Sequence, residues 1–133
     1  MHIHTTDTLQ PNTERSLLLS ELHDIPGEWG VSAETIERIA GAIPGELFGP
    51  GDSPLTAGVE AQVRRLLEVA HLVRLLVFPT PAAEWLVSGQ RELALATPLA
   101  VISRSGGLAY VRDLLRSAWE EAVAEVGNGS GIA

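Results

Sequence analysis

Apolar residues along this chain recur at intervals of three and four, the spacing that places them on one face of an α-helix. The longest such run, at 58–78, carries a stripe made of Val59, Val63, Leu66, Ala70, Val73 and Val77. No segment alternates β-branched or aromatic residues with polar ones over the length of a strand. The pattern therefore predicts an all-α fold.

The N-terminal part carries weaker helical segments. Residues 13–23 are predicted to form a short helix, and IPGEW at 25–29 is predicted to be a turn. Ser32 is a suitable N-cap for a helix over SAETIERIAGA, which Gly41 helps to end. The stretch at 43–54 is rich in glycine and proline, so we expect a connector there with at most one helical turn.

The C-terminal half is predicted to run long helix, short helix, short helix, long helix. A Ser-Pro pair at 53 and 54 leads into the long helix, whose far end is apolar nearly all round and is therefore expected to be enclosed. Thr-Pro pairs at 80–81 and 97–98 begin the two short helices, because proline suits the first helical position. A last helix is expected from Leu108 to about Val126, returning over the long one.

These elements predict a single compact helical domain with a smaller helical part before it. The division expected from the sequence has a flexible N-terminus at 1–12, a short helical region at 13–52, the main helical domain at 53–126 and a flexible tail at 127–133.

The net charge of the chain indicates which kinds of partner it can bind. The chain has 17 acidic and 9 basic residues, all of the latter arginine, and a formal net charge of -8. A surface of this sign repels phosphate backbones, so nucleic acid is possible as a partner but disfavoured. The sequence has neither cysteine nor an apolar run long enough for a membrane span, and its start lacks the pattern of a secretory signal. We therefore expect a cytoplasmic protein without a membrane partner.

Candidate catalytic and metal-ligating residues are sparse. His2 and His4 have a ligand-like spacing but no third ligand nearby, and the remaining histidines are scattered. Glu120 and Glu121 are adjacent, so they point about 100° apart on a helix and cannot act as a facing acid and base. Neither a phosphate-binding glycine loop nor a nucleophile motif is present. The sequence predicts no enzyme, no cofactor and no metal.

The arginines allow two interpretations. In the first, they belong to a solvated helix face: Arg64 stands four residues from Glu60 and from Glu68, and Arg116 stands four residues from Glu120. Alternatively, those with fewer local partners face another protein, because arginine is enriched at binding hot spots. The candidate contact residues of such a surface are Arg104, Arg112, Arg116 and Trp119.

The segment from 83 to 115, AEWLVSGQRELALATPLAVISRSGGLAYVRDLL, carries a recognisable order of residues. It resembles the toxin-binding domain of the Xre/MbcA/ParS antitoxins, which has a Trp-Leu pair, a leucine-containing link, Thr-Pro-Leu or Lys-Pro-x-Asp, a glycine, a valine and a leucine-rich last helix. With the preceding long helix the resemblance covers 59 to about 117. The matching structural positions include Trp85, Leu86, Leu93, Thr97, Pro98, Leu99, Gly107, Val111, Leu114 and Leu115.

Upstream, GVSAETIER resembles the second helix of a Cro-type helix-turn-helix, with Ser32, Thr35 and Arg38 at matching positions. These three residues are the candidate DNA contacts. The preceding helix of such a unit is not evident in the sequence, and Glu34 and Glu37 stand where DNA-reading helices usually avoid acids.

The resemblance implies an antitoxin that binds and neutralises a cognate toxin, commonly a RES-domain enzyme that consumes NAD, with its last helices and C-terminal tail. It also implies self-association, with a homodimer expected. One alternative is a repressor that binds the DNA of its own operon through the Ser32–Arg38 segment. Another is a non-catalytic helical scaffold, possibly dimeric.

Overall fold

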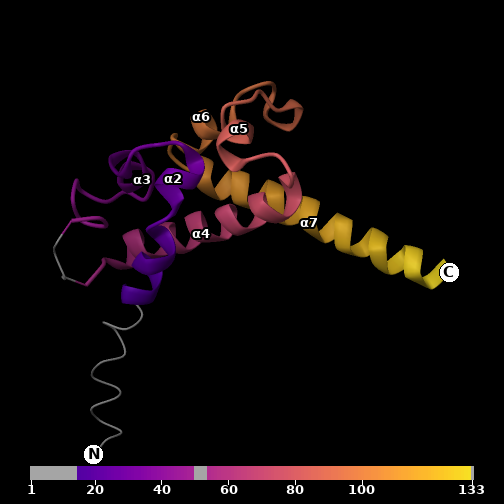
Figure 1. Ribbon diagram of the computed structural model, residues 1–133, viewed down its shortest axis with the longest axis horizontal. Helices are drawn as coiled ribbons and strands as arrows, with labels where there is room; N and C mark the ends of the chain where they lie inside the picture. Colours follow the sequence, from indigo (N-terminus) through magenta and orange to yellow (C-terminus); the bar gives the residue numbers. More distant parts are fainter. Residues whose placement is uncertain (1–14, 50–53, 133) are drawn as a thin grey trace, which may run out of the picture. The chain divides into compact units, whose positions relative to one another are not determined.

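All regular elements of the described residues are helices (Figure 1). The computed structural model describes residues 15–49 and 54–132, without the side chains of 127–132. Residues 15–22 are helical. The helices that follow are α2 (Ile25–Trp29), α3 (Ala33–Ile39), α4 (Ala57–Val77), α5 (Ala82–Leu86), the 3₁₀ helix η1 (Arg91–Leu93), α6 (Pro98–Ile102) and α7 (Gly107–Ile132). The predicted all-α fold is confirmed.

The chain divides into two compact units, Met1–Leu67 and Glu68–Ala133. The division falls inside α4, whose first part packs in the first unit and whose second part packs in the second. The boundary predicted at residue 53 precedes this helix. The sequence pattern places a domain boundary in the segment before α4, but the structure divides within α4, because the two ends of this helix pack in different units.

Residues 25–29 of the first unit form α2, so the prediction of a turn there was wrong. Pro26 lies in the first turn of the helix, where a backbone N–H has no partner within the helix, so its absence in proline costs no hydrogen bond. Gly30 ends the helix in the left-handed conformation, with φ of 70°. Ile25 and Trp29 are buried. Proline and glycine occur at helix boundaries as well as in turns. Here the segment is helical, and the helix buries the side chains of Ile25 and Trp29.

Helix α3 forms where the sequence predicts it. The Ser32 side chain accepts a hydrogen bond from the backbone N–H of Thr35 at 3.1 Å, which satisfies one of the free donors of the first turn. Ile36, Ile39 and Ala40 form the predicted buried face.

Helix α4 differs from its prediction at both ends. It begins at Ala57, and the Thr56 hydroxyl accepts the Val59 N–H, so Thr56 is the cap; Ser53 lies outside the described residues. The expected enclosure of its C-terminal end was wrong, because Leu75 is 44% exposed and Phe78 80% exposed. The helix is also shorter than α7, with 21 residues against 26. Five members of the predicted stripe are buried, namely Val59, Val63, Leu66, Ala70 and Val73.

In the second unit the short helices pack against one another and on α7, with α5 on α6 and α6 on α7. Thr97 caps α6 by accepting the Ala100 N–H, as the Thr-Pro pair predicts, whereas α5 begins without a side-chain cap. The largest fully buried apolar side chains of this unit include Leu86, Ile102, Leu108 and Val111.

Gly107 is required where α7 begins against α6. A Cβ atom added there would lie 1.6 Å from the carbonyl oxygen of Val101, a distance that no side chain can adopt. The glycine pair that follows α6 therefore permits a close crossing of two helices, in addition to the change of chain direction that the sequence predicts.

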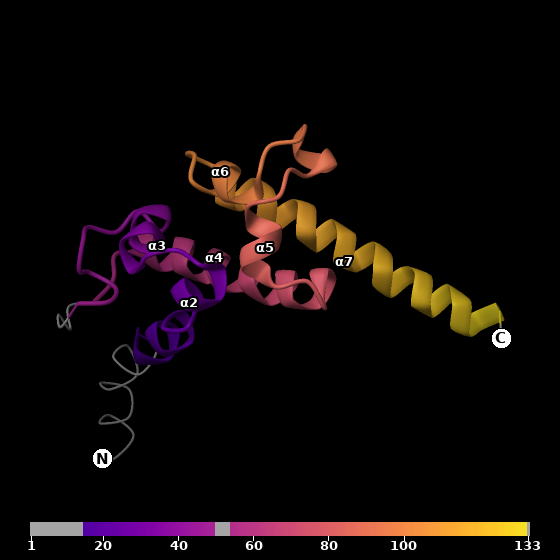
Figure 2. The same ribbon diagram turned by 45° about the horizontal axis from the view of Figure 1, so that its top comes forward.

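Helix α7 continues to Ile132, past the expected end at Val126. Glycines in 127–131 lower helix propensity, but no proline is present to stop the helix. In Figures 1 and 2 its C-terminal part extends beyond the other helices of its unit.

Candidate protein-binding site

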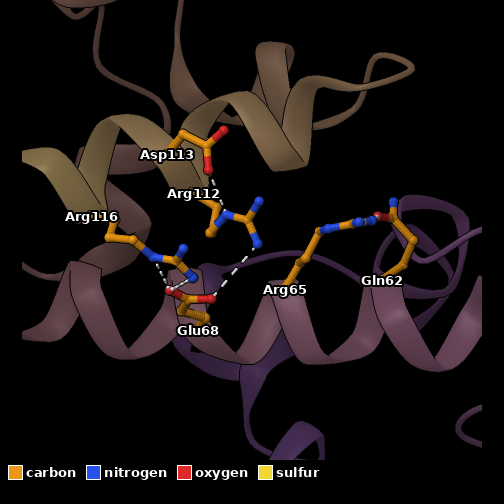
Figure 3. A network of polar contacts seen from close by, with 6 residues as sticks. All are labelled: Gln62, Arg65, Glu68, Arg112, Asp113 and Arg116. Atoms are coloured by element: carbon orange, nitrogen blue, oxygen red, sulfur yellow. Dashed lines mark hydrogen bonds and ion pairs between the residues drawn. The ribbon is translucent and has the colours of Figure 1, made fainter.

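Glu68 of α4 is the centre of an ion-pair network with α7 (Figure 3). The Arg116 guanidinium donates to one oxygen of Glu68 from Nε at 2.9 Å and from Nη2 at 2.5 Å. The Nη1 of Arg112 lies 3.9 Å from the other oxygen, and its Nε donates to Asp113 at 2.7 Å. The hydrogen bond and the charge of Glu68 raise the pKa of Arg116 above its ordinary value.

This network changes the interpretation of the arginines. The idea that Arg112 has few partners was wrong, because Asp113 and Glu68 both engage it. Arg116 binds Glu68 rather than Glu120, its neighbour along the helix. Sequence spacing can identify partners within one helix, but Glu68 and Arg116 meet across two helices. Arg116 therefore links α7 to α4, whereas Arg112 hydrogen-bonds within α7 and lies 3.9 Å from Glu68.

Arg104 is the predicted contact arginine that stays available. It is exposed in the turn between α6 and α7 and makes no ion pair with any residue that the structure describes. Its side chain lines an open cavity of about 390 Å³ together with Tyr110 and Glu92.

The C-terminal part of α7 carries an uncovered apolar face. Trp119 is 37% exposed, Val123 51% and Val126 70%. Their spacing of four and three places them on one side of the helix. Between 117 and 126 the sequence contains three glutamates and no cation. This α7 face, defined by Trp119, Val123 and Val126, is apolar with acidic neighbours.

Of the candidate DNA contacts, Ser32 and Thr35 bind each other. Their hydroxyl oxygens lie 2.9 Å apart, and Ser32 also caps the helix. Arg38 is exposed and has no ion pair among the residues described in this unit. Helix α2 precedes α3 and packs on it.

Glu37 is directed into the first unit instead of outward from α3. Its carboxylate accepts the backbone N–H groups of Gly45 and Leu47 at 2.9 Å and of Phe48 at 3.1 Å. Burial raises the pKa of Glu37, but these three bonds outweigh it and hold the pKa below its ordinary value. Only Glu34 of the two acids in α3 therefore faces solvent.

The described residues offer neither a metal site nor a membrane-spanning helix. Within 15–49 and 54–126, no three His, Asp or Glu side chains gather where they could hold a metal ion; His2 and His4 lie outside the described residues. Among the described helices, none alone is long and apolar enough to cross a membrane.

Comparisons with protein-family models, with curated proteins and with solved structures find no match to this chain.

Proposed function

We propose that the chain is an antitoxin that binds a toxin protein through the α7 face and neutralises it by contact. The observation that carries the proposal is the exposure of Trp119, Val123 and Val126 on a helix that extends beyond the other helices of its unit. A helix without tertiary packing is marginal in water, so a covering partner would stabilise it. Each large apolar side chain buried by a partner contributes about 1.5–3 kcal/mol.

The chemistry of this face indicates the character of the partner. Glu120, Glu121 and Glu125 are the charges nearest to it in sequence, so a complementary surface would be apolar with a basic rim. The motif resemblance points to a RES-domain toxin that consumes NAD. A homodimer and a cytoplasmic location belong to the same proposal, and nothing in it requires a catalytic group or a cofactor.

Co-expression with the protein encoded beside it tests this function. We expect growth and cellular NAD to be preserved by the wild-type chain and lost with Val123→Asp. Val87→Asp is the matched control, because Val87 is an exposed valine of the same unit outside α7, at 62% exposure. A neighbouring product that is not toxic, or equal rescue by both variants, would contradict the proposal.

A second candidate is binding to the operator of its own operon through α3. The packed pair α2 and α3, with Arg38 exposed and Glu37 turned inward, favours it. Binding to the promoter should then fall steeply with salt, and Arg38→Gln should weaken it more than Arg64→Gln, since Arg64 already pairs with Glu60 at 3.1 Å. No promoter shift at low salt, with or without the toxin, would exclude this candidate.

A further inference from the structure

A second uncovered surface lies on a different side of α7, beside α4, α5 and η1. It is a cavity of about 460 Å³ that is open to solvent at Ala118 and Glu121. Its apolar walls come from four elements of the second unit and include Leu76, Val77, Trp85, Leu93, Leu114 and Ala118. A volume of this size accommodates one or two large apolar side chains of a partner.

The cavity continues along α7. A second hollow, of about 400 Å³, shares Ala118 and Glu121 with the first and adds Ala122, Ala124 and Glu125. Ala118, Glu121, Ala122 and Glu125 follow one another at steps of three, one and three, so these four lie on one side of the helix. The two hollows together make a groove whose α7 wall is formed by Leu114, Leu115 and Ser117 at one end and carries three alanines toward the other. Small side chains there allow a second helix to approach α7 closely.

The charges of the groove have a single sign. The ionisable residues that line the two hollows are Glu92, Glu121 and Glu125, and the described lining contains no arginine or histidine. Glu121 and Glu125 stand one helical turn apart, about 6 Å along the axis. Lysine or arginine at positions i and i+4 of an opposing helix would match them.

We propose that this groove binds a basic amphipathic helix of a partner protein, with an apolar anchor in the larger hollow and cations opposite Glu121 and Glu125. A second copy of this chain is a poor occupant, because residues 117–126 of its α7 would place carboxylates against carboxylates. The proposal concerns a different side of α7 from the α7 face and does not rest on the antitoxin function.

The probe is a synthetic helix of leucine and lysine, with leucine at i, i+3, i+4 and i+7, titrated into the full chain at low ionic strength. Labelled-peptide anisotropy gives the Kd. Trp85 lines the groove, so in a Trp29→Phe, Trp119→Phe background its fluorescence reports occupancy. We expect saturable one-site binding. A peptide with glutamate in place of every lysine should not bind.

Two pairs of variants locate the site. Glu121→Gln with Glu125→Gln should raise the Kd about two- to thirtyfold. Glu84→Gln with Glu120→Gln removes the same charge outside the groove and should leave the Kd near that of the wild type. Ala118→Phe should fill the groove and raise the Kd about tenfold or more, whereas Ala100→Phe on α6 should not.

Equal losses in the two charge variants, unchanged binding by Ala118→Phe, or equal binding of the acidic peptide would each overturn the proposal. Because the measurement contains no toxin, its failure leaves the antitoxin function standing. The reverse also holds, since loss of toxin rescue says nothing about the groove.

Discussion

The two compact units each hold one glutamate that several donors bind, and they use it differently. Glu37 of the first unit is 2% exposed and accepts three backbone N–H groups from a single turn. Glu68 of the second unit has a side chain that is 33% exposed and is bound by arginine side chains from α7. The buried Glu37 carboxylate holds the backbone of one turn in place, and the partly exposed Glu68 carboxylate links α4 to α7.

The difference extends to the apolar surface of each unit. The first unit buries its tryptophan, Trp29, at 1% exposure, whereas the second leaves the α7 face uncovered. The first unit also exposes Leu17 at 59% and Ile43 at 70%, but Leu17 lies in the helix at 15–22 and Ile43 in a loop, so they do not share one helix face. The second unit instead exposes three apolar side chains on one helix face with acidic neighbours, and the proposed partner binding rests on that face.

Replacing Trp29 and Trp119 tests this difference in burial between the two units most directly. Trp29→Ala should lower the free energy of unfolding by about 3–5 kcal/mol, because it leaves a cavity in a fully packed site. Trp119→Ala should cost about 1 kcal/mol or less, as an exposed position does. Urea denaturation followed by far-UV circular dichroism measures both. Similar losses would mean that Trp119 also belongs to a core.

Trp29→Phe separates the effect of losing side-chain volume from the effect of removing the buried indole N–H. The indole Nε1 of Trp29 is buried and has no hydrogen-bond partner in the described part of the chain, so its desolvation is uncompensated. Phenylalanine removes this N–H and keeps most of the volume. The loss should therefore be well below that of Trp29→Ala, and an equal loss would show that the indole shape itself is needed.

Glu37→Gln tests the buried carboxylate. The amide keeps one acceptor oxygen but places an NH₂ group against backbone donors, so we expect a loss of about 1–3 kcal/mol. Glu34→Gln, on the exposed side of the same helix, is the matched control and should be nearly neutral. Hydrogen exchange of the amides of Gly45, Leu47 and Phe48 should accelerate in the first variant alone.

The acid dependence of stability follows from the lowered pKa of Glu37. A carboxyl whose pKa is lower in the folded state contributes stability above its unfolded pKa, about 4.3 for glutamate, and that stability is lost as pH falls through the folded pKa. Wild-type stability should therefore fall below about pH 4 more steeply than that of Glu37→Gln. Parallel curves for the two proteins would show that other carboxyls govern acid unfolding.

Local features could be predicted from the sequence. The Ser32 and Thr97 caps, the Ile36 face of α3 and the stripe of α4 depend on residues within one or two turns, and each is found as expected. Features that depend on residues far apart in the sequence could not be predicted. The partners of Glu37 lie 8 to 11 residues away in a glycine-containing turn, and Arg116 lies 48 residues from Glu68.

Periodicity also cannot tell which part of an apolar stripe is covered. Leu108, Val111 and Leu115 share one stripe on α7 with Val126, yet the first three are buried and the last is exposed. The groove likewise joins residues of four elements, and the alanines on its α7 wall have no distinct sequence signal. Of the two surfaces, the sequence predicts only Trp119 as a contact residue, because the extent of each depends on how the other helices pack around α7.

The smallest effect is expected at Glu68. Glu68→Gln should destabilise the protein much less than Glu37→Gln, since Glu68 and Arg116 are near solvent and exposed ion pairs contribute little. Its effect should shrink further as salt is added, because mobile ions screen exposed charges, whereas the effect of Glu37→Gln should persist. Denaturation of the three proteins at low and high NaCl measures this. A loss at Glu68 that persists at high salt would show that the network is effectively buried and that the two glutamates act alike.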